Sequence, residues 1–178
     1  DGFLIETENI LHDPNARSTL IYNFLKKEGL PFDAIFTGVQ SEDDQFAAVG
    51  GILAAKLRIP FVSMVIGIDN IENGYAIVRR ELEGGLQERI KISLPCVMSI
   101  QTGINEPRYV SIMGIRKASK VERKVLKASD YQENVENKIE LTRWVYPLKK
   151  EGATLLSPDL ENACKELLNI LKEKGVYQ

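Results

Sequence analysis

Residues 36–57, FTGVQSEDDQFAAVGGILAAKL, begin like a strand, pass through a short polar loop and end like a helix. Gly38 stands where the apolar run 34–36 stops, and an acidic triplet follows at 42–44. Alanine and glycine then occupy most of the first helical turns, which lets such a helix lie very close to a neighbouring group. The pattern predicts a strand at 33–37 and a helix at 44–57, with the acids at its N-terminus.

The flanking segments extend this unit in both directions. An apolar run at 3–5 is typical of a buried strand, and Asp13-Pro14 is a helix start in which Asp13 is the N-cap. That helix carries an apolar face at 3.6 spacing and stops at Gly29, and residues 61–68 form a second doubly buried strand. A β-α-β-α-β order with short loops predicts an α/β fold with a Rossmann-like parallel sheet, in which strand 2–6 pairs.

The remainder of the chain has a different pattern. Residues 75–82 and 86–94 are strand-like and are joined by Glu83-Gly84-Gly85, which predicts a hairpin added to the sheet. A last apolar strand follows at 96–100, and 101–135 is polar and irregular. An extended arm at 136–157 and a helix at 158–174 complete the chain. We expect two domains, 1–135 and 136–178, and an α/β domain that lacks its N-terminal part.

Composition narrows the class of protein. The 178 residues are 44% apolar and 27% charged with a net charge of −2, so nothing predicts binding to nucleic acid. No apolar run reaches the roughly 18 residues of a membrane span, and a cytoplasmic location is expected. Cys96 and Cys164 are far apart, and the only histidine, His12, is expected to have a loop or capping role. Neither a metal site nor a catalytic constellation is predicted, so we do not expect an enzyme.

The loop at 38–51 is the candidate binding site. In an open parallel sheet, ligands bind at the carboxyl ends of the strands, where a helix N-terminus also attracts anions. Small residues at Ala47, Ala48, Gly50 and Gly51 would let a phosphate or ribose approach the backbone. A capped helix that packs tightly on a sheet would give the same pattern, because the loop is neither GxGxxG nor a Walker A motif.

Three stretches, GVQSEDDQFAAVGG, VRRELEGGLQERIKISLPCVMSI and NEPRYVSIMGIRKASK, together resemble the β subunit of electron transfer flavoproteins. The resemblance covers about residues 2–175 and implies an adenine nucleotide alpha hydrolase-like fold, preceded in the family by a further N-terminal portion. It also implies a heterodimeric electron carrier in which the α subunit holds most of the FAD site and this subunit binds AMP or a second FAD. The implied partners are the α subunit, acyl-CoA or other flavin dehydrogenases and a quinone oxidoreductase, in the bacterial cytoplasm or the mitochondrial matrix.

By the same resemblance, the nucleotide loop runs from Gly38 to Val49, with Gln40, Ser41 and Asp43 as the principal contacts. The loop departs from the family pattern in two ways, since Ala48 and Val49 stand where Thr or Gln is usual before Gly50, and Gln45 stands where an acid is common. The residues expected to bind the nucleotide are Gly38, Val39, Gln40, Ser41, Asp43, Asp44, Gln45, Phe46, Ala47, Ala48 and Val49.

A second site is expected in the stretch 105–120. In a carrier it would dock dehydrogenases, with Ile112 as an apolar anchor and Arg108 and Tyr109 fixing the base of the loop. A packed surface loop is the alternative for this stretch, and a nucleotide-binding regulatory domain without a redox role is the alternative for the whole chain. A regulatory domain has no need of an exposed apolar anchor here, which separates the two functions.

Overall fold

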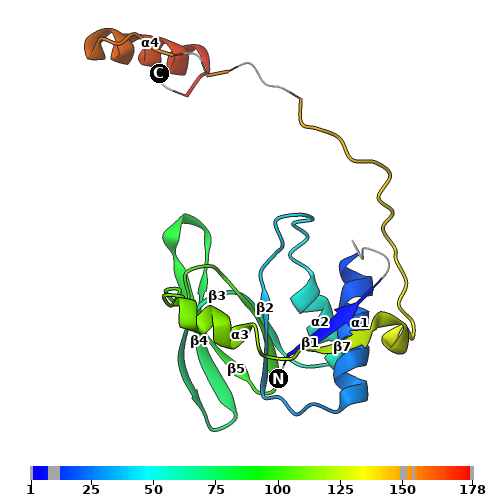
Figure 1. Ribbon diagram of the computed structural model, residues 1–178. Helices are drawn as coiled ribbons and strands as arrows, with labels where there is room; N and C mark the ends of the chain where they lie inside the picture. Colours follow the sequence, from blue (N-terminus) through cyan, green and yellow to red (C-terminus); the bar gives the residue numbers. More distant parts are fainter. Residues whose placement is uncertain (1, 8–12, 149–151, 154, 177–178) are drawn as a thin grey trace. The chain divides into compact units, whose positions relative to one another are not determined.

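A computed structural model describes residues 2–7, 13–148, 152–153 and 155–176 (Figure 1). The chain divides into two compact units, Asp1–Thr142 and Arg143–Gln178. The boundary between the two units follows Thr142, a few residues beyond the boundary expected after residue 135. His12 lies outside the described residues, so its expected role has no structural counterpart here.

The first unit begins with the expected alternation of strands and helices. In chain order these elements are β1 Phe3–Glu6, α1 Pro14–Glu28, β2 Ala34–Gly38, α2 Val49–Leu57 and β3 Phe61–Glu72. The expected start of α1 is confirmed, because a carboxylate oxygen of Asp13 accepts the N–H of Asn15 at 2.7 Å and Pro14 opens the helix. Its expected end is confirmed as well, since Gly29 adopts the left-handed conformation at φ 59°.

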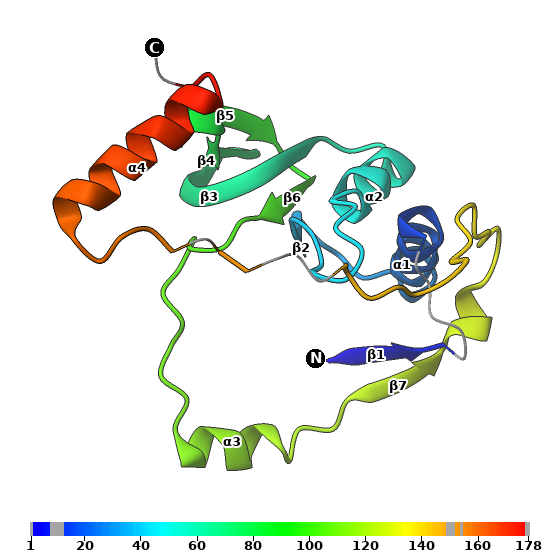
Figure 2. The ribbon, with the colours of Figure 1, turned by 90° about the horizontal axis from the view of Figure 1, so that it is seen from above.

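The main sheet has five strands in the order β2-β6-β3-β4-β5 (Figures 1 and 2). β6, Cys96–Ile100, lies between β2 and β3 and runs parallel to both. β4, Tyr75–Glu81, and β5, Gln87–Ser93, form the expected hairpin at the antiparallel side of the sheet. Gly84 and Gly85 both have positive φ in the connecting 3₁₀ turn, which explains the pair of glycines. The expected α/β class with an added hairpin is confirmed.

The core of this unit lies where α2 and the hairpin meet the parallel strands. α2 packs against β2, β3 and β6, and its Leu53 and Ala54 are buried. The strands contribute a continuous apolar cluster, made of Val62, Val65, Ala76, Val78, Ile92, Cys96 and Met98.

The expectation that the N-terminal strand joins the main sheet is wrong. β1 pairs in parallel with β7, Lys124–Lys127, and the two form a separate two-stranded sheet (Figure 2). Phe24 of α1 packs edge-on against the ring of Phe3 at 5.2 Å and against Tyr131 at 5.7 Å between ring centroids, so this small sheet has its own core.

The stretch expected to be irregular, 101–135, contains three short elements. They are α3 Ile112–Ala118, β7, and a 3₁₀ turn at Ala128–Tyr131. β7 carries a lysine at each end, which hides it from a pattern search. Its pairing depends on backbone hydrogen bonds, such as the one from the N–H of Lys124 to the carbonyl of Gly2 at 2.9 Å.

The expected start of the second helix at residue 44 is also wrong. Gln45 and Ala47 both have φ 52°, a left-handed conformation that interrupts any right-handed helix, and α2 begins only at Val49. Its N-cap is Ala48, which makes no side-chain hydrogen bond to the helix. The acids at 42–44 therefore belong to a loop and do not cap α2.

Among its described residues, the second unit contains one helix, α4 Leu160–Glu173, within the expected span 158–174. The carboxylate of Asp159 caps it by accepting the N–H of Asn162 at 3.0 Å. Among the described residues of the expected arm, 136–148, 152–153 and 155–157, none lies in a helix or a strand.

Candidate functional site

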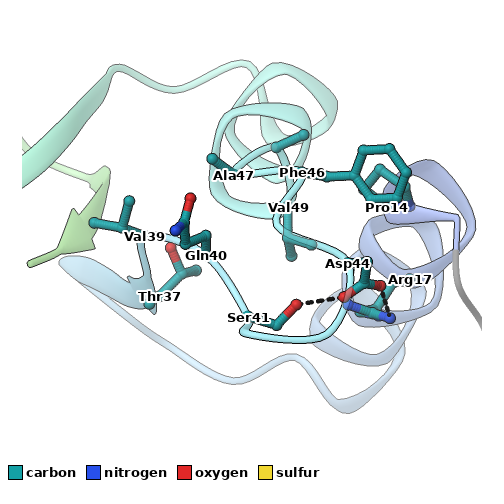
Figure 3. Close-up of a pocket in the computed structure, with 12 residues that line it drawn as sticks. Pro14, Arg17, Thr37, Val39, Gln40, Ser41, Asp44, Phe46, Ala47 and Val49 are labelled. Atoms are coloured by element: carbon teal, nitrogen blue, oxygen red, sulfur yellow. Dashed lines mark hydrogen bonds and ion pairs between the residues drawn. The ribbon is translucent and has the colours of Figure 1, made fainter. Parts of the chain in front are cut away.

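A cavity of about 250 Å³ lies at the carboxyl end of β2, between the first turn of α1 and the loop that leads into α2 (Figure 3). This is the edge at which open parallel sheets bind ligands. Its lining comes from three segments and consists of Pro14, Arg17, Thr37, Gly38, Val39, Gln40, Ser41, Asp44, Phe46, Ala47, Ala48 and Val49.

Most of the loop residues expected to bind a nucleotide thus lie on one cavity wall. The exceptions are Asp43 and Gln45, which are exposed and do not line it. Of the two left-handed residues in the loop, Ala47 lines the cavity and Gln45 does not. Asp44 and Phe46 also line the cavity, whereas Asp43 lies outside its wall.

Two hydrogen bonds hold Asp44 in the loop. Its Oδ1 accepts the hydroxyl of Ser41, and its Oδ2 lies 2.9 Å from Nη2 of Arg17 on α1 (Figure 3). The Ser41 hydroxyl and the Arg17 guanidinium together lower the pKa of the Asp44 carboxyl, against the opposite effect of its partial burial. Asp44 is therefore ionised at neutral pH and ties the loop to the first turn of α1.

The glycines of α2 serve packing and not ligand approach. A Cβ at Gly50 would lie 2.6 Å from Oγ1 of Thr37 and 3.2 Å from the ring of Phe61, and a Cβ at Gly51 would lie 3.4 Å from the same ring. Both glycines thus let α2 lie against β2 and β3. On the cavity side, the small residues are Ala47 and Ala48 of the loop.

Thr37 carries an unusual polar group for a cavity wall. Its Oγ1 is buried and has no hydrogen-bond partner among the residues that the structure describes. Buried hydroxyls are nearly always paired, so an orphan at a cavity marks a place where a ligand could supply the partner. Gly38, the next residue, has open space where a Cβ would lie and a φ outside the left-handed region.

Reasoning from the loop alone missed three lining residues, Pro14, Arg17 and Thr37. A signal for Thr37 was present, because it is the next-to-last residue of its strand and open parallel sheets bind ligands at the carboxyl ends of their strands. Pro14 and Arg17 lie in the first turn of α1, which follows a strand of the other sheet, so this rule does not predict them.

The second expected site lies on and before α3, and we call residues 108–118 the α3 surface. Every residue of it is exposed, including Tyr109 at 94% and Ile112 at 74%. Ser111 caps the helix by accepting the N–H of Gly114 at 3.1 Å, which fixes Ile112 as its first residue. Val110, Met113 and Ile115 add further exposed apolar area beside Ile112.

The described residues contain no group of three or more His, Cys, Asp or Glu side chains placed to hold a metal ion. None of their helices combines the length and hydropathy that crossing a membrane requires.

Comparison with known proteins places these observations in a family. Residues 2–131 match the model of the electron transfer flavoprotein domain. The electron transfer flavoprotein subunit beta of Bacillus subtilis is 32% identical over 97% of this chain and 67% of its own length. That of Methylophilus methylotrophus is 29% identical over 86% of this chain and 60% of its own length. A caffeyl-CoA reductase-Etf complex subunit, CarD of Acetobacterium woodii, is 40% identical over 48% of this chain and 32% of its own length.

The chain thus spans about 60% of the length of the Methylophilus relative. The family match nevertheless includes β2, α2, the hairpin and the cavity loop in one continuous segment. The expected resemblance is confirmed, and the chain belongs to the electron transfer flavoprotein family.

Proposed function

We propose that this chain acts as the β subunit of an electron transfer flavoprotein and binds an adenine nucleotide in the cavity at residues 37–49. The observation that carries the proposal is the cavity itself. It lies at the carboxyl end of β2, and Gly38, Gln40, Ser41 and Asp44 from the family's loop line it.

The cavity wall suits a nucleotide. It offers the orphan hydroxyl of Thr37, the amide of Gln40, and open space beside Gly38, so a ribose or phosphate oxygen would find both room and donors. Of the two neighbouring acids, Asp44 is the better candidate for contact because Asp43 lies outside the wall. The volume of about 250 Å³ lies just below the ~300–1,000 Å³ typical of small-molecule sites, which supports AMP before a second FAD.

The redox role would belong to the heterodimer. An FAD held mainly by the α subunit would supply one- and two-electron chemistry, and this chain would act as a carrier subunit and not as an enzyme.

The exposed α3 surface supports this role over that of a regulatory domain. Ile112 would be the apolar anchor for acyl-CoA or other flavin dehydrogenases and for a quinone oxidoreductase, with Arg108 and Tyr109 beside it. The relatives include bacterial and mitochondrial proteins, which supports the bacterial cytoplasm or the mitochondrial matrix as the compartment.

The second unit would pack on the α partner. Trp144 is exposed, Tyr146 is 98% exposed, and α4 leaves Leu160, Leu167 and Leu168 at least partly open to solvent. Such apolar side chains are costly to leave in water. We expect the heterodimer interface to bury on the order of 2,000 Å² or more, as obligate interfaces do.

Co-expression with an α subunit tests the proposal. A stable 1:1 complex on size-exclusion chromatography, whose denatured form releases FAD and one AMP by mass spectrometry, is the expected result. A monomer that copurifies with neither the α subunit nor a nucleotide would contradict it. Release of a second FAD in place of AMP would keep the subunit assignment and overturn the choice of ligand.

A further inference from the structure

The charges on the cavity wall come from two different elements. Among the described residues that line the cavity, Arg17 of α1 is the one cation and Asp44 of the loop is the one anion. They lie 2.9 Å apart, with the Arg17 side chain about one third exposed and that of Asp44 largely covered. The remaining acids of the loop, Glu42 and Asp43, are exposed and outside the wall.

This arrangement creates a problem for any anionic ligand. An ionised carboxylate on the wall repels a phosphate but has no such effect on an uncharged nucleoside. The loop offers no basic residue in compensation, because residues 38–49 contain neither Lys nor Arg. Val49 and the N-cap residue Ala48 also lack polar side chains that could bind the phosphate.

The guanidinium of Arg17 can offset the repulsion between Asp44 and a phosphate. A guanidinium carries five N–H donors in a planar fork, so it can hold a carboxylate and a phosphate oxygen at the same time. It reaches the cavity from the first turn of α1, opposite Thr37 and Gln40 (Figure 3). Its position is fixed by Asp44, so the cation is already oriented before a ligand binds.

We infer that Arg17 determines ligand class at this site, by offsetting Asp44 and binding phosphate so that the cavity selects a nucleotide over its nucleoside. The inference rests on the proposed nucleotide site and adds to it a residue from outside the family's loop. It assigns to Arg17 the phosphate contacts that Ala48 and Val49 cannot make.

Calorimetry with AMP and with adenosine tests the inference, using the full chain and three variants. Arg17→Met removes the charge at nearly constant length, and Arg17→Lys keeps it. The third variant, Arg17→Met with Asp44→Asn, removes both charges. The first variant should bind AMP roughly 10- to 100-fold more weakly, the factor for one hydrogen bond to a charged group, and adenosine within about 3-fold of wild type. Arg17→Lys should keep a preference for AMP, and the double variant should bind AMP more tightly than Arg17→Met does.

The outcomes separate this inference from the proposed function. Equal losses for AMP and adenosine in Arg17→Met would make Arg17 a packing residue and overturn the inference, while nucleotide binding would stand. A wild-type chain that binds neither compound would overturn both. If Arg17→Met does not fold, the salt dependence of binding to the wild-type chain tests the inference instead. The ratio of its AMP affinity to its adenosine affinity should fall between about 0.05 and about 1 M NaCl, because salt screens the charges. A constant ratio would contradict the role of charge.

Discussion

α2 and α3 are short helices of similar composition with opposite surroundings. Each follows a parallel strand of the main sheet, β2 or β6, and each carries several aliphatic residues and at least one glycine. Leu53 of α2 is 0% exposed, whereas Ile115 of α3 is 57% exposed and no residue of α3 is buried. Aliphatic content alone therefore does not separate a core helix from an exposed one.

The difference follows from what each helix connects. α2 is the crossover between β2 and β3, which lie in the same sheet, so the chain must carry it back over that sheet. α3 leads from β6 of the main sheet to β7 of the two-stranded sheet, and no such constraint holds it against either. An apolar helix that topology leaves uncovered is a candidate for contact with another protein.

The comparison predicts its largest effect at Leu53. Leu53→Ala should lower the free energy of unfolding by about 2–5 kcal/mol, because it leaves a cavity between α2 and the sheet. The matched change Ile115→Ala in α3 should cost no more than about 0.5 kcal/mol, since that side chain is already in water. Urea unfolding of both variants measures the two values. Similar losses would mean that α3 is packed and would remove the contrast.

A smaller effect is expected at the glycines of the two helices. Gly50→Ala should cost about 1–3 kcal/mol, because its Cβ would meet Oγ1 of Thr37 at 2.6 Å and the ring of Phe61. Gly114→Ala in α3 should change stability by no more than about 1 kcal/mol, because the gain in helix propensity is offset by a Cβ that would lie 3.3 Å from Oγ of the capping Ser111. Thermal unfolding monitored by circular dichroism gives both numbers.

A second substitution identifies the clash. Adding Thr37→Ala to Gly50→Ala removes the hydroxyl that the new Cβ would meet, and it should recover part of the lost stability. If the double variant is less stable than Gly50→Ala by the full cost of Thr37→Ala alone, the crowding is not between these two groups.

The same contrast explains which parts of the molecule the sequence could predict. The strands at 34–38 and 96–100, the first part of β3 at 61–68 and the hairpin follow from continuous or alternating apolar runs, which depend only on burial in a sheet. The polar end of β3 at 69–72 does not, because it is defined by its antiparallel pairing with β4. β7 could not be found this way, because its two lysines mask a strand that is defined by backbone pairing with β1. The acids at 42–44 resemble a helix N-terminus and so predict too early a start for α2, whereas Asp44 pairs with Arg17.

The sequence predicts which loop lines the cavity, but not which residue supplies the positive charge on its wall. Topology and the family resemblance both pointed to residues 38–49. The cation on the wall comes from a residue 27 positions before its partner, a separation that no local pattern records.

Ile112 tests the contrast between the buried α2 and the exposed α3 through electron transfer. Ile112→Ala should weaken association with a flavin dehydrogenase by about 1–3 kcal/mol, as loss of a small apolar anchor does, and slow reduction of the heterodimer accordingly. Flavin content and Tm should stay near wild type, because the side chain is exposed. Stopped-flow reduction by a dehydrogenase that reduces the wild type provides the measurement, and Val121→Ala, another exposed aliphatic residue just beyond α3, is the control. Early melting of Ile112→Ala, or reduction at the wild-type rate, would remove the docking role.

The smallest expected effect concerns the loops that precede the two helices. Charged groups hold the loop before α2, since Asp44 accepts from Ser41 and Arg17, whereas a neutral hydroxyl, Ser111, caps α3. The Ser41 hydrogen bond and the Arg17 ion pair lower the pKa of Asp44 from its ordinary value of 3.8. A carboxyl whose folded pKa is lowered stabilises the protein fully above its unfolded pKa, and it loses that contribution as pH falls through the folded value. The Tm difference between wild type and Asp44→Asn should therefore be constant from pH 7 to about 5 and should narrow below about 4.

Two variants serve as controls. Asp43→Asn, one residue away and outside the cavity wall, should show a smaller Tm difference from wild type. The Tm difference for Ser111→Ala should not change with pH in this range, because the capping hydroxyl stays neutral. A difference for Asp44→Asn that persists undiminished at pH 2 would mean that the loop is held by shape and not by charge.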